Sequence, residues 1–351
     1  MAKRARTVEI VETDRVEGFA HPREAVRLAG QDAALARAAR AIRGGRPPQA
    51  WLISGPPGIG KATLAYRIAR YLLAYGATDE GAADLSVPSN LPAAKQVAAG
   101  SHPGLLVLKR GVNPDTGKLM TVLSVDEIRK LAGFFGMTSG AGGWRVAVVD
   151  TADDMNEAAA NALLKLLEEP PSRAMLLLVA NVPGRLLPTI RSRCQRLELR
   201  PLDAQTMDRE LKTLLPELKA DERASLTRLS GGSPGMALTL ADGEGTGLAT
   251  EADRLIERAT DPDIPALIAF ADKIGRVTDG LEDFGALLAQ SLAERIVARA
   301  SSGARLDRWI DAREQLIRSF ARSTALHLDP RQTVLGAARI LSGAARRAGA
   351  V

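Results

Sequence analysis

Short apolar runs alternate with stretches of helical spacing over the first two hundred residues. Apolar runs predict buried strands at residues 50–54, 105–108, 146–149 and 175–180, with a fifth strand at 195–199. Helical spacing occupies the segments between them, at residues 31–42, 61–74, 124 onward and 156–168. Strands that are apolar on both sides and alternate with helices are typical of a parallel sheet covered on both faces. The pattern therefore predicts an α/β domain.

After residue 201 only helical periodicity remains. It is clearest over residues 204–215, 221–229, 284–300, 307–323 and 330–347. We predict an α/β domain over 1–201 that starts with an irregular extension (1–28), a helical lid over 202–242, and an all-helical C-terminal domain over 243–351. Residues 76–100 are rich in Ala, Gly, Ser, Pro and Asp, and are expected to form a loop or irregular insertion.

A glycine-rich loop follows the first predicted strand. Residues 55–63 read GPPGIGKAT, close to the phosphate-binding pattern G-x-x-x-x-G-K-[ST]. Gly55, Gly58 and Gly60 suit a backbone cradle for phosphate, and Lys61 adds positive charge. The pattern requires a hydroxyl residue directly after the lysine, where it ligates Mg²⁺. Here that residue is Ala62, and Thr63 comes one position later. The loop predicts a degenerate site for ATP or ADP, or alternatively a loop kept for packing.

The third predicted strand ends at Asp150, the place where P-loop ATPases keep a carboxylate for Mg²⁺. Thr151 follows, and a threonine cannot act as a general base near neutral pH. Asp153 and Asp154 lie nearby and are expected to cap the next helix. The missing metal ligand and the missing base together predict that the chain does not hydrolyse nucleotide efficiently.

The composition indicates which binding partners and which cellular compartment to expect. The 351 residues carry a formal net charge of +6, which fits a nucleic-acid partner or simply an arginine-rich composition. Aromatic residues make up 3%, so base stacking is poorly supported. One cysteine, Cys194, permits no disulfide within the chain. No signal-peptide core or membrane-spanning run is seen, and a cytoplasmic location is expected. The histidines are far apart in sequence and predict no metal site: His21, His102 and His327.

Two further motifs carry a resemblance. Residues 161–171 read NALLKLLEEPP, and after the next predicted strand residues 192–194 read SRC. Together with the glycine loop, these residues resemble the clamp-loader branch of the AAA+ ATPases. The motif-bearing resemblance covers roughly residues 25–240. It implies an AAA+ P-loop domain, a small helical lid and a helical collar domain.

The resemblance also assigns roles. It implies that Arg193 is an arginine finger inserted in trans into the nucleotide site of an adjacent ATPase subunit. Asn181 falls where the family places a polar sensor, although an ordinary strand-end turn explains it equally well. Met236 stands where relatives often carry a lid arginine. These departures point to a non-hydrolysing stator in a hetero-oligomer with ATPase subunits of gamma/tau type and a delta-type subunit. That assembly acts indirectly on a sliding clamp and holds primer–template DNA.

One family feature is missing. Relatives commonly carry four zinc-binding cysteines between the glycine loop and a His-Pro pair. Here His102-Pro103 is present, but residues 64–101 contain no cysteine, so no zinc is predicted. Two alternatives stay open at this stage: an active ATPase motor subunit of the same loader, and a P-loop small-molecule kinase. The SRC segment and the helical last third argue against the kinase.

Overall fold

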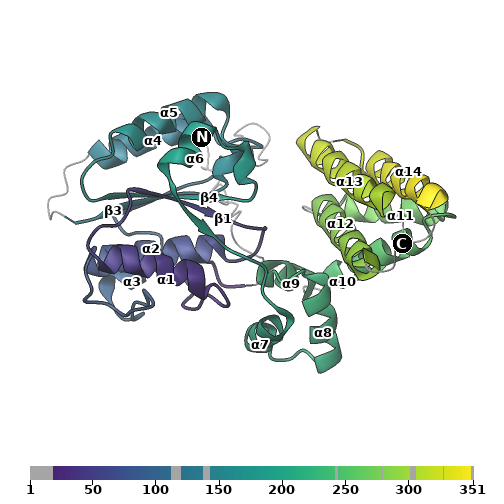
Figure 1. Ribbon diagram of the computed structural model, residues 1–351, viewed down its shortest axis with the longest axis horizontal. Helices are drawn as coiled ribbons and strands as arrows, with labels where there is room; N and C mark the ends of the chain where they lie inside the picture. Colours follow the sequence, from purple (N-terminus) through teal and green to yellow (C-terminus); the bar gives the residue numbers. More distant parts are fainter. Residues whose placement is uncertain are drawn as a thin grey trace, which may run out of the picture. The chain divides into compact units, whose positions relative to one another are not determined.

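The computed structural model describes residues 19–111, 120–136, 143–241, 244–277, 280–300, 306–326 and 328–348 (Figure 1). By density of contacts the chain forms two compact units. The first comprises Met1–Thr206 with Ser233–Gly235, and the second comprises Met207–Gly232 with Met236–Val351. The separate lid over 202–242 remains a prediction.

The first unit is built on a parallel sheet of five strands in the order β2-β3-β4-β1-β5. Every neighbouring pair runs parallel, so all five strands end at the same edge. The predicted parallel α/β fold is confirmed. The strands are β1 Ala50–Ser54, β2 Leu105–Leu108, β3 Arg145–Val149, β4 Ala174–Ala180 and β5 Gln195–Glu198.

Helices cover both faces of this sheet (Figure 1). On one face lie α1 Asp32–Arg43, α2 Lys61–Tyr75 and α3 Pro92–Ala98; on the other lie α4 Val125–Gly136, α5 Glu157–Glu168 and α6 Pro188–Arg193. Successive strand side chains enter opposite cores. Trp51 and Ile53 belong to the core under α1 and α2, whereas Leu52 belongs to the core under α4 and α5. This double burial is why the inner strands β1, β3 and β4 are almost entirely apolar, whereas the edge strand β5 exposes three of its four residues.

Two short helices were missed by the sequence patterns. The segment 76–100, expected to be irregular, contains α3. Pro92 stands in its first turn, where a missing N–H costs nothing, and Ala94 and Val97 are buried one turn apart. The other is α6, six residues long and also begun by a proline. Both helices are too short to show a periodicity of their own.

The described part of the N-terminal extension, residues 19–28, has no helix or strand, as predicted. Two buried arginines on α2 nevertheless fix its backbone. Arg67 donates to the carbonyl of Val26 at 2.9 Å, and Arg70 donates to the carbonyl of Arg23 at 2.7 Å. Burial next to Arg67 lowers the pKa of Arg70, yet both side chains satisfy backbone oxygens. Residues 1–18 lie outside the described residues.

The second unit is helical throughout its described residues, as expected. Helix α13 packs against α12 and α14, and Phe284 lies between Phe270 and Phe320 with ring centroids 4.8 and 6.0 Å away. Over the described part of the chain, no helix is both long and apolar enough to cross a membrane. From residue 204 the helices are α7 Ala204–Leu214, α8 Ala220–Leu229, α9 Pro234–Ala241, α10 Glu244–Glu257, α11 Ile264–Ile274, α12 Gly280–Arg299, α13 Asp307–Leu326 and α14 Pro330–Ala348.

Candidate functional site

The glycine loop lies at the carboxyl edge of the sheet, between the end of β1 and the start of α2. Gly55, Gly58 and Gly60 all have positive φ, at 153°, 70° and 97°. A residue with a Cβ adopts these angles reluctantly, so the glycine spacing follows from the turn itself. The first N–H groups of α2, which have no partner within the helix, open onto this loop. The local geometry is that of a phosphate-binding loop.

Lys61 is turned back onto its own loop. Its residue is only 6% exposed, and Nζ donates to the carbonyl of Pro56 at 2.6 Å. Burial lowers the pKa of Lys61 to about 8, while the negative charges of Asp153 and Asp150 oppose that shift. The lysine is thus mostly protonated at pH 7 and close to both carboxylates.

The positions expected to hold magnesium and to activate water are poorly equipped. Asp150 is buried at the end of β3, and its carboxylate accepts the N–H of Thr151 at 3.0 Å. Ala62 offers only a methyl group, and Thr63 lies about 100° further around α2 and so points elsewhere. Within the described ranges, no group of three or more His, Cys, Asp or Glu side chains is arranged to hold a metal.

Asp153 does not cap the following helix, so the sequence interpretation of this residue was wrong. Asn156 caps α5 instead, accepting the N–H of Ala159 at 2.8 Å. The Asp153 carboxylate accepts the main-chain N–H groups of Asn181 and Val182, at 3.1 and 2.7 Å. Asp153 therefore fixes the turn after β4, which places Asn181 at the same edge as the glycine loop. Asp154 pairs with an arginine, Arg110, at 3.6 Å.

A distant segment lies on the glycine loop, and sequence reasoning missed it. We call Ser233–Gly235 the clasp. Ser233 Oγ donates to the carbonyl of Pro57, and the N–H of Gly235 donates to the carbonyl of Gly58, both at 2.9 Å. A Cβ on Gly235 would lie 2.6 Å from Gly58 Cα, so only glycine fits here. The clasp touches the main chain of the loop directly.

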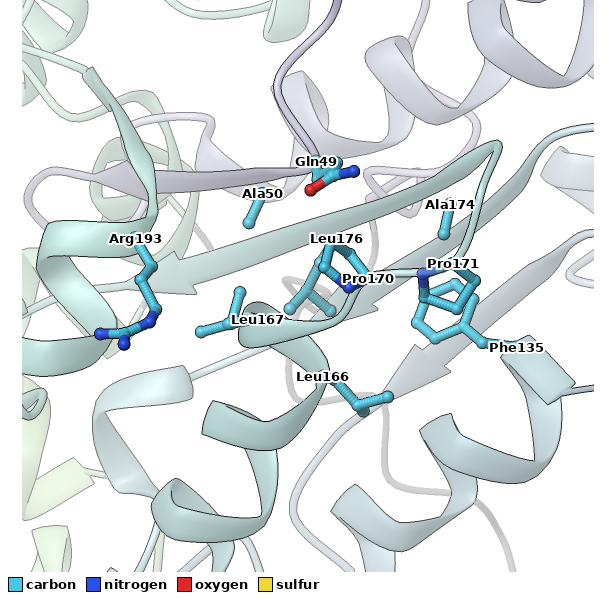
Figure 2. A pocket seen from close by; sticks show the side chains of 10 residues that line it. All are labelled: Gln49, Ala50, Phe135, Leu166, Leu167, Pro170, Pro171, Ala174, Leu176 and Arg193. Carbon is cyan, nitrogen blue, oxygen red and sulfur yellow. The ribbon is translucent and has the colours of Figure 1, made fainter.

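Arg193 lies at the opposite edge of the sheet. It ends α6, two residues before Gln195, which pairs with Trp51 near the start of β1. The five residues of β1, rising about 3.3 Å each, separate this amino edge from the glycine loop by about 16 Å. Arg193 also lines a pocket together with Gln49 and Ala50, which precede and begin β1 (Figure 2). The structure therefore does not bring Arg193 together with Lys61.

Three contacts hold the Arg193 side chain, which is 38% exposed. Nη2 lies 2.9 Å from Glu168 Oε1, and Nη1 donates to the carbonyl of Thr189 at 3.3 Å. The pocket at its side has a volume of about 80 Å³, with Arg193 at one end and Phe135 at the other (Figure 2). Its remaining walls are mostly apolar: Gln49, Ala50, Leu166, Leu167, Pro170, Pro171, Ala174 and Leu176.

The cysteine beside Arg193 has no reactive character. Cys194 is buried, and this burial raises the pKa of its thiol to about 12. A thiol of that pKa is protonated near neutral pH and is a weak nucleophile. Cys194 therefore offers no reactive thiolate beside Arg193.

Comparison with known proteins relates the chain to replication proteins. Residues 30–203 match the family model described as DNA polymerase III, delta subunit. A curated relative, "DNA polymerase III subunit delta'" of Pseudomonas aeruginosa, is 38% identical over 217 residues, 61% of this chain and 62% of the relative. The protein of the same name from Escherichia coli is 35% identical over 57% of this chain and 56% of its own length. "DNA polymerase III subunit gamma/tau" of Mycobacterium bovis is 30% identical over 63% of this chain and 37% of its own length.

The chain spans about three fifths of the length of the two delta' relatives. Among solved structures, a DNA polymerase III gamma subunit-related protein of Thermotoga maritima is 17% identical, with a TM-score of 0.46, over 89% of this chain and 99% of its own. A RuvB Holliday junction branch migration motor of the same organism is 19% identical over 68% of both chains, with a TM-score of 0.41.

Proposed function

We propose that this chain is a delta'-type stator of a bacterial clamp loader, because residues 30–203 match the family model described as DNA polymerase III, delta subunit. It supports the loading of a sliding clamp on primed DNA and supplies Arg193 in trans to the nucleotide site of a neighbouring ATPase subunit. It hydrolyses little or no ATP itself.

The observation that carries this proposal is the separation of the two functional edges. A residue about 16 Å from its own glycine loop is far beyond the reach of an arginine side chain. Arg193 can therefore contact a γ-phosphate only if another subunit brings that phosphate to the amino edge. Arginine supplied by a neighbour is a known way to stabilise charge in phosphoryl transfer.

The chain's own nucleotide site supports a binding role without turnover. Gly55, Gly58 and Gly60 keep the loop geometry, and Lys61 keeps its charge near pH 7. The groups for metal binding and for activating water are replaced by Ala62 and Thr151. We propose that ATP or ADP binds here weakly, with little dependence on Mg²⁺, and is not hydrolysed.

The names of the relatives support the proposed partners. Because these relatives are named as delta' and gamma/tau subunits of DNA polymerase III, we propose a complex of this chain with ATPase subunits of gamma/tau type. We further propose a delta-type neighbour and an indirect effect on the clamp, in a hetero-oligomer acting in the cytoplasm. The net charge of +6 would help the complex bind primer–template phosphates, which predicts binding that weakens as salt rises.

Two measurements test the proposal. Phosphate release by the purified chain, with ATP, Mg²⁺ and primed DNA, should stay far below 1 s⁻¹, a low value for an enzyme. Native mass spectrometry after mixing with the ATPase and delta-type subunits of the same organism should show a hetero-oligomer containing this chain. Failure to enter any such complex would refute the stator role.

The same measurements address the second candidate, an active motor subunit. The gamma/tau relatives, which match 63% of this chain, are the observation that favours it. Turnover by the isolated chain near 1 s⁻¹ would favour this motor role over the stator.

A further inference from the structure

Glu168 is the last residue of α5, and its carboxylate lies 2.9 Å from the guanidinium of Arg193. Stability does not explain an acidic side chain at this position. A helix carries partial negative charge at its carboxyl end, so a carboxylate there is unfavourable by a few tenths of a kcal/mol or more. The adjacent residue, Glu169, is also acidic, which adds repulsion. The electrostatics of the helix end therefore do not explain why a carboxylate stands at position 168.

The contacts around Arg193 supply that reason. The stem of Arg193 lines the apolar pocket with Leu167 and Leu176, while Glu168 and the carbonyl of Thr189 each take one donor of the guanidinium (Figure 2). A guanidinium has five N–H donors in a rigid fork. Among the described residues these two hydrogen bonds occupy two donors, and three are left for another acceptor. Arg193 is thus held on one side and available on the other.

We propose that Glu168 is a positioning residue for Arg193: it holds the guanidinium at the amino edge so that the remaining donors meet the terminal phosphate of a neighbouring subunit's nucleotide. The inference rests on the proposed role of Arg193 in trans. Orientation of a long side chain before the neighbour binds reduces the conformational freedom lost at that step. The hydrogen bond that Glu168 accepts from Arg193 matters here more than the charge of Glu168, because that charge would repel phosphate.

That distinction sets the experiment. The complex is reconstituted with the ATPase and delta-type subunits, and DNA-dependent ATP hydrolysis is measured. The rate that depends on Arg193 is the wild-type rate minus the rate with Arg193→Ala. Glu168→Ala should lower this Arg193-dependent rate about two- to fivefold, the effect of an exposed ion pair. Glu168→Gln, which keeps an oxygen acceptor, should restore most of it.

Three controls separate positioning from a structural role. Glu169→Ala, which removes the adjacent exposed carboxylate, should leave the rate unchanged. Glu168→Ala should have an unchanged or raised melting temperature, because it relieves the charge at the end of the helix. Glu168→Ala combined with Arg193→Ala should be no slower than Arg193→Ala alone.

The outcomes separate the role of Glu168 from that of Arg193. If Arg193→Ala lowers the rate but Glu168→Ala does not, or if Glu168→Gln exceeds wild type, positioning by Glu168 is refuted and the role of Arg193 stands. If Arg193→Ala leaves the rate of an assembled complex unchanged, both are refuted.

Discussion

The two edges of the parallel sheet differ in the functional groups that they carry. At the carboxyl edge, the glycine loop keeps its backbone geometry but lacks a hydroxyl at Ala62 and a carboxylate at Thr151. At the amino edge, Arg193 is held by an ion pair, a carbonyl and an apolar pocket. The backbone geometry of a phosphate-binding loop is kept at one edge, and a partly exposed arginine is held in place at the other.

This difference indicates that the structural contacts of the glycine loop and the groups expected for nucleotide turnover belong to different residues. The glycines and Lys61 make contacts within the chain, since the clasp bonds to Pro57 and Gly58 and the lysine bonds to Pro56. Those contacts give the loop a structural role that does not require nucleotide turnover. Under the proposed function, the groups that Ala62 and Thr151 lack serve turnover alone, so their absence leaves these structural contacts intact.

The largest expected effect is at the amino edge. Arg193→Ala should lower ATP hydrolysis at the neighbouring subunit's site by about 10³-fold or more, as loss of an arginine finger does elsewhere. The variant should fold and assemble normally, because the side chain is 38% exposed and its ion pair contributes little to stability. Single-turnover hydrolysis in the reconstituted complex measures the effect.

Arg196→Ala is the matched control for charge. Arg196 is an exposed arginine on β5, three residues away, and its loss should leave the single-turnover rate unchanged. Equal losses from Arg193→Ala and Arg196→Ala would mean that the amino edge acts through its general positive charge.

The next largest effect concerns Lys61 at the carboxyl edge. Burial costs the charged lysine free energy, and the drop in its pKa from 10.5 to about 8 corresponds to roughly 3 kcal/mol. Lys61→Met should therefore raise the free energy of unfolding at pH 7, by about 1 to 3 kcal/mol once the lost hydrogen bond to Pro56 is included. Urea unfolding measures the gain.

The stability difference between wild type and Lys61→Met should depend on pH, because the pKa of Lys61 is lowered in the native chain. Between pH 8 and 10.5 the unfolded chain binds the lysine proton more strongly than the native chain, so wild-type stability rises with pH relative to Lys61→Met. The advantage of the variant should be complete below pH 8 and shrink toward pH 10.5. Lys165→Met, at an exposed position on α5, should show no such trend. A constant difference across this window would contradict the buried charge.

The clasp provides a second test of the carboxyl edge. Gly235→Ala places a Cβ 2.6 Å from Gly58 Cα, and because this contact is with main chain, relief requires a shift of the backbone. We expect the free energy of unfolding to fall by about 1 to 3 kcal/mol, the usual cost of overpacking. The amide at position 235 should also lose its protection from hydrogen exchange, because its bond to the Gly58 carbonyl is broken.

Gly133→Ala is the control for this substitution. Gly133 lies in α4 with no atom within 4 Å of the added Cβ, so alanine should stabilise that helix by up to about 1 kcal/mol. If Gly235→Ala and Gly133→Ala were equally stable, the contact between the clasp and the glycine loop would contribute nothing to the free energy of unfolding.

The local features of this protein were predictable from sequence, and the long-range contacts were not. Apolar runs located β1, β2, β3 and β4, because these strands place apolar side chains on both faces of the sheet, and glycine spacing located the loop. The edge strand β5 exposes three of its four residues and is not an apolar run. By contrast, Ser233 bonds to a residue 176 positions away, and Asp153 to a turn 28 positions away. Glu168 and Arg193 are separated by 25 positions. No periodicity encodes such pairs, which is why the sequence predicts a helix cap at Asp153 and gives no sign of the clasp.

The smallest expected effect is that of restoring the metal ligand alone. Ala62→Thr supplies the hydroxyl that Mg²⁺ requires, and calorimetry with and without Mg²⁺ should show a modest gain in magnesium-dependent binding of ADP. Phosphate release should remain at the background level, because Thr151 still cannot activate water, and groups that act together in one step do not restore its rate singly. Ala62→Thr combined with Thr151→Glu should exceed either single variant, and Met236→Arg should add to that pair. If Ala62→Thr alone gave turnover near 1 s⁻¹, a single lesion would explain the carboxyl edge. In that case the missing hydroxyl at position 62 alone would explain the lack of turnover. The glycine loop would then be an ATPase site that one substitution activates.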